Sequence, residues 1–412
     1  MITLLQNLQG IVTPRQDLPY GELDIREDAA IAIENENILQ IGTGNELRQQ
    51  YPDGAVLDGG GCWAHPGYVD PHTHPVFYKT REEEFVMRLQ GRSYEEIAEA
   101  GGGIRNSVRA LRSASADELS ELTYRRIREF IPQGTTTIEA KSGYGLSLDD
   151  ELKSLRVLKK MSELLPISIV PTFLGAHEVP DEYRDQRETY IKLIINEMIP
   201  AVAEEKLAVF CDVFTEKNVF SIAESEQILL AAKDHGLIPK LHADELHPLG
   251  GAELAAKVKA ISADHLLMVS EAGIKEMRES GVVPVLLPGT AFFLGKERYA
   301  PARRMIDSGL PVALATDYNP GSSFTQNMNL ILSLGCIQMR MLPAEALWSA
   351  TLIAARAIGR EQDYGSLEAG KKADIVLQEV PGYKYIPYHY GMNHVRMVIR
   401  HGEVIHQSEG IA

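Results

Sequence analysis

The middle of the chain alternates short, almost wholly apolar runs with longer segments of mixed polarity. The apolar runs predict eight strands, at residues 68–74, 135–140, 167–177, 208–214, 238–245, 260–267, 282–289 and 311–317. Strands that are apolar along their whole length are typical of a parallel sheet covered on both faces. The segments between them show helical spacing, as in the stripe formed by Leu119, Leu122, Ile127 and Phe130, which indicates a helix face turned to the core.

Pairs of residues with the spacing of a capping box mark the starts of three of these helices. They are Ser115 with Glu118, Ser147 with Asp150 and Ser221 with Glu224. Eight strand–helix units predict an α/β fold, a (β/α)8 TIM-type barrel. An open doubly wound sheet is the alternative, but the chain carries no G-x-G-x-x-G fingerprint.

The two ends of the chain have a different pattern, with alternating strand-like runs punctuated by Asn and Gly. Such runs lie at 28–42 and 55–61 near the start and at 371–380 and 394–406 near the end. We expect residues 1–64 and 365–412 to build one small β-sandwich module, and residues 65–364 to form the barrel. The uncharged stretch 281–295 is too short and too rich in Pro and Gly for a membrane span, and predicts a buried strand with its loop.

Polar groups stand at the carboxyl ends of several predicted strands, where a barrel of this type carries its chemistry. His72 and His74 are one residue apart, and strand alternation turns both rings to the same side. The other strand ends carry His177, His242 with Glu245, His265 and Asp317. A single histidine at a strand end is more often structural than a ligand. Metal-capable groups at corresponding ends of several strands favour a metal site.

Imidazole and carboxylate ligands suit Zn²⁺ or iron. A catalytic site of this kind lowers the pKa of a bound water to about 7. Asp317 is placed to take that water's proton, Glu245 to shuttle protons to the substrate, and His265 to polarise a carbonyl or orient the water.

Composition narrows the classes of partner. The formal net charge of −16 argues against sequence-independent nucleic-acid binding and against an anionic membrane surface. Cys62, Cys211 and Cys336 are isolated, which predicts neither disulfides nor a thiolate zinc site and fits a reducing compartment. The first residues have no basic region before an apolar core, so we expect no signal peptide and a cytoplasmic protein.

Several motifs carry a resemblance to a known family. The segments PGYVDPHTH, KLHADE, SADH and LATDYNPG resemble the amidohydrolase superfamily. The segments RLQGRSYEEIAEAGGGI, EAKSGYGLSLDDELK, TFLGAHEVP and ATDYNPGSS are similar to its imidazolonepropionase family, and the resemblance extends in order over essentially the whole chain. It implies hydrolysis of the ring C–N bond of 4-imidazolone-5-propanoate to N-formimidoyl-L-glutamate, the third step of histidine degradation.

The resemblance also implies a set of site residues. One divalent metal per subunit, Zn²⁺ or Fe²⁺/Fe³⁺, would be held by His72, His74, His242 and Asp317. The substrate would be contacted by Arg81, Tyr94, Tyr144, His177 and Glu245, and the product by Asn319, Gly321 and Ser322. An arginine suits the propionate tail because a guanidinium matches a carboxylate. A homodimer is the assembly that the family suggests.

Each of these residues taken singly also has a structural interpretation. In this structural interpretation, Arg81 pairs with the three glutamates that follow it, and Tyr94 covers the start of a helix. Gly143 and Gly145 would then serve only a tight turn. Lys141 is interpreted as structural or as a local charge partner. The fourth strand ends without the lysine that bridges two metals in many superfamily members, which favours one metal, with Glu216 as the alternative bridge to a second.

Two rival functions share parts of this pattern. A purine or pyrimidine deaminase on the same scaffold would use the same metal ligands, but it needs no carboxylate clamp such as Arg81. A non-enzymatic assembly protein on this scaffold generally lacks ligands, whereas all four are present here. Metal analysis of the purified protein separates this second rival from an enzyme.

Overall fold

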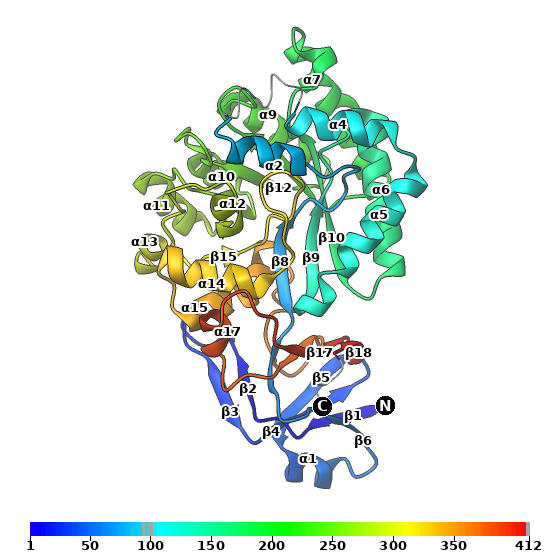
Figure 1. Cartoon of the computed structure of the whole chain (residues 1–412), viewed down its shortest axis with the longest axis vertical. Helices are drawn as coiled ribbons and strands as arrows, with labels where there is room; N and C mark the ends of the chain where they lie inside the picture. The colour runs from blue at the N-terminus through cyan, green and yellow to red at the C-terminus, as the bar shows by residue number, and fades with distance from the viewer. Residues whose placement is uncertain (93–95, 97–101, 409–412) are drawn as a thin grey trace.

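The computed structural model describes residues 1–92, 96 and 102–408 and consists of a barrel above a small β module (Figure 1). The eight barrel strands are all parallel and lie in chain order across one sheet. They are β8 (Tyr68–Thr73), β9 (Thr135–Lys141), β10 (Ser168–Ala176), β11 (Phe210–Thr215), β12 (Ile238–Ala243), β13 (Ser262–His265), β14 (Val283–Leu286) and β15 (Ala313–Leu314). Each predicted apolar run overlaps one of them, and the predicted (β/α)8 class is confirmed.

The last strand meets the first just beyond the end of β15, which closes the barrel. Thr73 and Tyr318 form a parallel bridge, and the backbone N–H of His74 donates to the Tyr318 carbonyl at 2.8 Å. The N–H of Asp317 donates to the His72 carbonyl at 3.1 Å. The loop that follows β15 is therefore held directly beside the His72–His74 pair.

Helices surround the barrel strands (Figure 1). The longer ones are α4 (Ile104–Ser113), α5 (Ala116–Arg128), α6 (Leu148–Leu164), α9 (Ile222–Asp234), α10 (Gly251–Val258), α11 (Glu271–Ser280) and α14 (Met328–Met339). Shorter ones are α1 (Gly44–Gln50), α2 (Glu82–Leu89), α7 (Arg187–Leu193), α8 (Ile199–Glu204), α12 (Pro288–Phe293), α13 (Ala302–Asp307), α15 (Pro343–Ser349), α16 (Leu352–Ala357) and α17 (Tyr385–Tyr388). No helix in the described ranges is both long enough and apolar enough to cross a membrane.

Two of the three predicted capping boxes are complete. Ser115 with Glu118 and Ser221 with Glu224 exchange both contacts of the motif. At the third, Ser147 accepts from the backbone of Asp150, and its hydroxyl donates to the Asp150 carboxylate at 2.7 Å. The segment 281–295 supplies the predicted strand β14, but the predicted loop is wrong: it is helix α12, which begins at Pro288, where a proline is tolerated because that N–H lacks a helical partner anyway.

The β module is built from both ends of the chain, as predicted. One sheet has the order β5–β4–β1–β6 and the other β18–β17–β16–β7–β2–β3. The strands are β1 (Ile2–Gln6), β2 (Gly10–Thr13), β3 (Asp24–Glu27), β4 (Ala29–Glu34), β5 (Asn37–Thr43), β6 (Ala55–Asp58), β7 (Trp63–Pro66), β16 (Ile375–Gln378), β17 (Val395–Arg400) and β18 (Glu403–Gln407). Apolar side chains of the two sheets, among them Leu5, Ile31, Ile11, Ile375 and Ile399, share one core, which is the packing of a β-sandwich.

Strand β7 pairs with β2 and β16 in the module and leads through Gly67 into barrel strand β8. A β-carbon at Gly67 would come within 2.3 Å of Thr136 Oγ1, so the chain passes close to β9 here. The exact division into 1–64 with 365–412 and 65–364 stays a prediction. Cys62, Cys211 and Cys336 are free thiols in the structure.

Candidate active site

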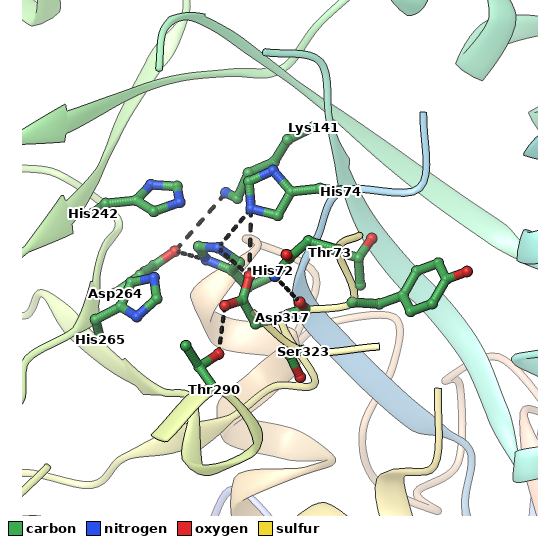
Figure 2. Close-up of polar contacts among 12 residues, drawn as sticks. His72, Thr73, His74, Lys141, His242, Asp264, His265, Thr290, Asp317 and Ser323 are labelled. Carbon is green, nitrogen blue, oxygen red and sulfur yellow. Dashed lines mark hydrogen bonds and ion pairs between the residues drawn. The ribbon is translucent and has the colours of Figure 1, made fainter. Parts of the chain in front are cut away.

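Four of the predicted strand-end histidines, His72, His74, His242 and His265, lie close together (Figure 2). His72 and His74 point the same way from β8 and the residue after it, and their Nε2 atoms lie 3.2 Å apart. Oδ1 of Asp317 lies 3.5 Å from both of these nitrogens. Three atoms with lone pairs that can bind a metal therefore converge on one point. All three side chains are buried.

Donor atoms of His72, His74 and His242 lie within 4.8 Å of one another, and so do those of His72, His265 and Asp317. The two groups share His72 and together contain all four ligands that were predicted. Three imidazoles and one carboxylate are a donor set for a divalent zinc or iron ion. These residues therefore fit a bound divalent metal.

Two buried carboxylates lie behind these imidazoles. Nδ1 of His72 lies 2.6 Å from Oδ2 of Asp264, and Nδ1 of His242 lies 3.0 Å from Oδ2 of Asp212. Asp264 accepts the Nδ1 hydrogen of His72 and so leaves its Nε2 lone pair for a metal, an arrangement common in histidine metal sites, and Asp212 lies beside Nδ1 of His242 as a charge partner. Neither Asp212 nor Asp264 was predicted.

Burial and mutual repulsion keep most of the site histidines neutral, which is the form that binds metal. Burial lowers the pKa of His72, His74 and His177 well below the ordinary histidine value, and neighbouring cationic groups lower it further. Burial also lowers the pKa of His265, to about 3. His242 differs, because burial lowers its pKa but the charge and hydrogen bond of Asp212 outweigh that effect and raise it.

The backbone is left-handed at two of the strand ends that carry the site. His265 has a φ of 78° and Asp317 a φ of 53°. Non-glycine residues rarely adopt this region, at a cost of about 1–3 kcal/mol each, and such positions gather at functional sites. The Asp317 side chain is fixed in turn by Thr290 on α12, whose hydroxyl donates to Oδ2 at 2.5 Å.

Glu245 follows β12 and faces the sixth strand end, with Oε1 at 3.7 Å from Nδ1 of His265. Burial, with the nearby charge of Asp317, raises the pKa of Glu245 to about 7. The carboxyl can therefore hold or release a proton near neutral pH. Asp244 fixes this turn by accepting from the backbone N–H groups at the start of α10, from Leu249 to Ala252.

Arg81 is brought to the site from the residue before α2. Its guanidinium lies against the backbone of Gly321, where a β-carbon would come within 2.1 Å of Nη2. The alternative interpretation, in which Arg81 only pairs with the glutamates that follow it, has weak support, because its closest ion pair, with Glu84, has a distance of 3.7 Å. Its Nε has no hydrogen-bond partner among the described residues. Tyr94, the next predicted contact, lies outside the described residues.

Tyr144 and His177 form an aromatic wall beside His74. The His177 ring stacks on that of His74 with centroids 5.4 Å apart, and the Tyr144 ring lies 5.2 Å from His177. Nδ1 of His177 lies 2.9 Å from the Gly143 carbonyl. Because a carbonyl only accepts, the ring hydrogen is on Nδ1 and Nε2 is left as an acceptor.

The loop that carries Tyr144 is wrapped around a carboxylate that sequence reasoning missed. Glu151 accepts hydrogen bonds from the backbone N–H groups of Gly143, Gly145 and Leu146. Gly143 has a φ of 109°, and a β-carbon at Gly145 would come within 2.5 Å of the Asp150 backbone. The tight-turn interpretation of these glycines therefore holds, and the turn presents Tyr144 to the site.

The loop after Asp317 contains the three residues predicted at the product. The Asn319 side chain accepts from the N–H groups of Gly321 and Ser322 and donates to the Asp317 carbonyl and to Oγ of Ser322. Its amide thus shapes the loop. The backbone of that loop lies against Arg81, which places it beside the predicted carboxylate clamp.

Lys141 and Glu216, the two residues linked to the question of a second metal, are both engaged elsewhere. Nζ of Lys141 donates to Glu139 and to Asp212, as a charge partner. The Glu216 carboxylate contacts Nδ1 of His247 at 2.8 Å and accepts from the N–H of Leu246. These contacts favour the single-metal prediction.

Similarity to solved structures concerns the fold. The structure superposes on Escherichia coli guanine deaminase with a TM-score of 0.78 at 14% identity, covering 99% of this chain and 100% of that one. It superposes on an adenosine deaminase from Xanthomonas campestris with bound zinc with a TM-score of 0.70 at 17% identity, covering 98% and 92% of the two chains. At these identities, the likeness shows a shared architecture.

Similarity in sequence is closer and extends over nearly the full length. The model of the amidohydrolase family matches residues 63–405. Imidazolonepropionase of Geobacillus sp. (strain WCH70) is 51% identical over 94% of this chain and 92% of its own length. Those of Brevibacillus brevis and Alkaliphilus oremlandii are 49% and 46% identical, over 96% and 98% of this chain and 94% and 96% of theirs. This chain therefore belongs to the amidohydrolase family and, within it, to the imidazolonepropionases.

Proposed function

We propose that the protein hydrolyses 4-imidazolone-5-propanoate to N-formimidoyl-L-glutamate. The observation that carries this proposal is the 51% identity to an imidazolonepropionase over 94% of the chain, joined to an arginine placed beside a cluster of metal-capable histidines. The reaction adds water to the ring carbonyl carbon and breaks the bond from that carbon to the ring nitrogen. The carbonyl becomes a carboxylate, and the leaving nitrogen takes up a proton.

The divalent metal would be held by His72, His74, His242 and Asp317. When bound, it supplies a Lewis acid for the carbonyl and lowers the pKa of the attacking water to about 7. Within this cluster Asp317 accepts the proton of the water, since its Oδ1 faces the centre of the site while Thr290 holds its Oδ2. We propose zinc or iron as the metal, because this donor set suits both.

Glu245 and His265 divide the remaining work. With its pKa raised to about 7, Glu245 is partly protonated at neutral pH and gives a proton to the leaving ring nitrogen. His265 is neutral at that pH and orients the carbonyl or the water. Replacing Glu245 by Gln should therefore reduce turnover far more than metal content, and equal loss of both would refute this assignment.

Arg81 binds the propionate tail. Its Nε is buried without a hydrogen-bond partner among the described residues, and a carboxylate supplies one. Tyr144 and His177 line the neighbouring wall, where they face the imidazolone ring, and Tyr94 is proposed to join them. The loop of Asn319, Gly321 and Ser322 closes the far side and contacts the product.

A deaminase of the same architecture is the rival that these contacts disfavour. Guanine and adenosine deaminases share the fold at 14% and 17% identity. Their substrates carry no carboxylate, so Arg81 would keep only its loose contact with Glu84, at 3.7 Å, and its buried Nε would stay without a hydrogen-bond partner among the described residues. We further propose that the protein is a homodimer. We also propose that it works in the cytoplasm, because its three free cysteines fit a reducing compartment.

The decisive experiment is an assay of the purified, metal-loaded protein with freshly made 4-imidazolone-5-propanoate. Loss of imidazolone absorbance is followed with and without a chelator, and the product is identified by mass. Chelator-sensitive formation of formimidoylglutamate is the expected result. Turnover of guanine or adenosine without turnover of the imidazolone would replace this proposal by the rival.

A further inference from the structure

A cluster of charged side chains lies inside the barrel, beneath the metal-capable residues, and the proposed reaction uses none of them. It contains Asp70, Glu139, Lys141, Asp212, Lys240 and Asp264, each with 0% of its surface exposed. They come from strands β8, β9, β11, β12 and β13. Buried charges are costly unless they are paired, so a cluster of this size needs a reason.

Lys141 stands at the centre of this cluster. Its Nζ lies 2.7 Å from Oε1 of Glu139 and 2.8 Å from Oδ2 of Asp212, and 3.9 Å from Oδ2 of Asp264. Figure 2 shows Lys141 beside His74, with the contact to Asp264 drawn. One ammonium group therefore connects carboxylates from three strands.

Two of those carboxylates are the ones behind the metal-capable imidazoles. Asp212 contacts Nδ1 of His242 with the same Oδ2 that faces Lys141, and its Oδ1 accepts the backbone N–H of His242. Asp264 contacts Nδ1 of His72, also through the oxygen nearest Lys141. The ammonium group of Lys141 faces both carboxylates, and each of these carboxylates in turn contacts a proposed metal ligand.

The second buried lysine occupies a different position. Nζ of Lys240 lies 3.7 Å from Asp264 and donates to the Pro71 carbonyl at 3.4 Å. Within the described residues it makes no ion pair with Asp212. Lys240 therefore matches Lys141 in burial and in charge but lacks the direct contact to the carboxylate behind His242.

We propose that Lys141 is a positioning residue for the metal: by holding Asp212, it fixes the imidazole of His242 in the orientation that binds the ion. This inference rests on the metal site of the proposed function. Partners that orient metal-bound histidines typically change metal affinity by about 10–100-fold when removed. The methylene stem of Met replaces that of Lys141 without its charge, so Lys141→Met is the direct test.

The experiment measures zinc dissociation constants of the full chain by competition with a chromophoric chelator. We expect Lys141→Met to weaken zinc binding by about 10–100-fold, and Lys240→Met, the matched control, by less than about threefold. The visible spectrum of the Co²⁺-loaded protein reports ligand geometry, and it should shift in Lys141→Met alone. Unchanged affinity and an unchanged spectrum in Lys141→Met, or equal losses in both lysine variants, would overturn the proposal.

A double-variant comparison tests the route through Asp212. If Lys141 acts through that carboxylate, Lys141→Met combined with Asp212→Asn should bind zinc no more weakly than Asp212→Asn alone. Losses that multiply would show that Lys141 acts by another route and would overturn the proposal. If Lys141→Met does not fold, Lys141→Gln, which keeps N–H donors without the charge, takes its place under the same criteria.

Failure of the metal site itself gives a different result. His74→Ala removes a proposed ligand without touching the charged cluster. If wild-type protein binds no zinc, or if His74→Ala binds it as tightly as wild type does, the site of the proposed function is wrong. Zinc binding that needs His74 but is indifferent to Lys141 leaves that function standing and removes only the present inference.

Discussion

The guanidinium of Arg81 lies so close to the α-carbon of Gly321 that a β-carbon there would come within 2.1 Å of Nη2. The atoms in the way belong to the end of a flexible side chain, so a methyl group at this position displaces the arginine and leaves the barrel intact. The backbone of Gly321 is outside the left-handed region, and alanine can adopt it. Alanine at Gly321 therefore tests the proposed role of Arg81 in binding a carboxylate without disturbing the fold.

Gly321→Ala should lower kcat/KM for 4-imidazolone-5-propanoate by about 10–100-fold, the equivalent of a lost charge-assisted hydrogen bond of about 1.5–3 kcal/mol. Steady-state kinetics measure this loss, and metal content and melting temperature should stay at the wild-type values. Gly382→Ala is the matched control, because a β-carbon at Gly382 meets nothing within 4 Å. Wild-type kinetics in Gly321→Ala would show that Arg81 does not bind the tail.

The pH dependence of turnover should report Glu245. Burial and the charge of Asp317 raise its pKa to about 7, so the carboxyl carries a proton below that pH and has lost it above. A protonated Glu245 is needed to give a proton to the leaving nitrogen, and kcat/KM should therefore fall on the alkaline side with an apparent pKa near 7. The measurement is a pH–rate profile of the metal-loaded enzyme.

Glu245→Gln is the control for that profile, since its amide does not titrate. The variant should be slower at every pH and should lack the alkaline limb. An alkaline limb that persists unchanged in Glu245→Gln assigns it to another group, and a fall on the acid side that disappears in the variant makes Glu245 a base.

The strand ends of the site could be predicted because they depend on local rules. Alternation along β8 puts His72 and His74 on one side, and parallel strands present their carboxyl ends at one edge. Asp264 could not be assigned in this way. It lies 192 positions from His72, and their contact depends on strand order and on the register that pairs His242 with Asp264. The sequence offered one signal for Asp264: it is an acidic residue inside an apolar strand, and a buried carboxylate needs a buried partner.

Other differences have equally specific reasons. The segment after β14 was predicted as a loop because Pro288 and Gly289 suggested one, but a proline is well suited to the first turn of a helix, and α12 begins there. That helix supplies Thr290, the residue that orients Asp317. Glu151 gives no distinctive sequence signal, because acidic residues are common in first helical turns, and only the folded loop shows its carboxylate enclosed by backbone donors.

Glu151→Gln should disturb the loop that carries Tyr144. The carboxylate accepts from three backbone N–H groups, and an amide turns an NH₂ group toward one or more of them. A buried donor left without a partner costs about 1–3 kcal/mol. Chemical denaturation should show a loss of this order, and KM for the imidazolone should rise because Tyr144 is displaced.

Glu118→Gln is the control for this variant. Glu118 is also an acidic residue in a first helical turn that accepts backbone hydrogen bonds, but it is exposed and belongs to a capping box that tolerates glutamine. Its stability and kinetics should remain close to wild type. A rise in KM in Glu151→Gln without any loss of stability would place Glu151 in direct contact with the substrate.

Metal removal should affect stability as well as activity. A ligand that binds only the folded protein stabilises it by about 2.7 kcal/mol at a free concentration 100 times its Kd. Dialysis against a chelator should therefore abolish turnover and lower the melting temperature, and added Zn²⁺ or Fe²⁺ should restore both. Differential scanning calorimetry of apo and reloaded protein measures the shift.

The variant His74→Ala tests whether that shift comes from the proposed site. In the wild-type protein, Nε2 of His74 converges with atoms of His72 and Asp317. Loss of this nitrogen should remove most of the response of the melting temperature to metal. His235→Ala, at an exposed position after α9, should respond as wild type does. An undiminished response in His74→Ala would mean that the stabilising ion binds elsewhere on the chain, and the ligand set would have to be reassigned.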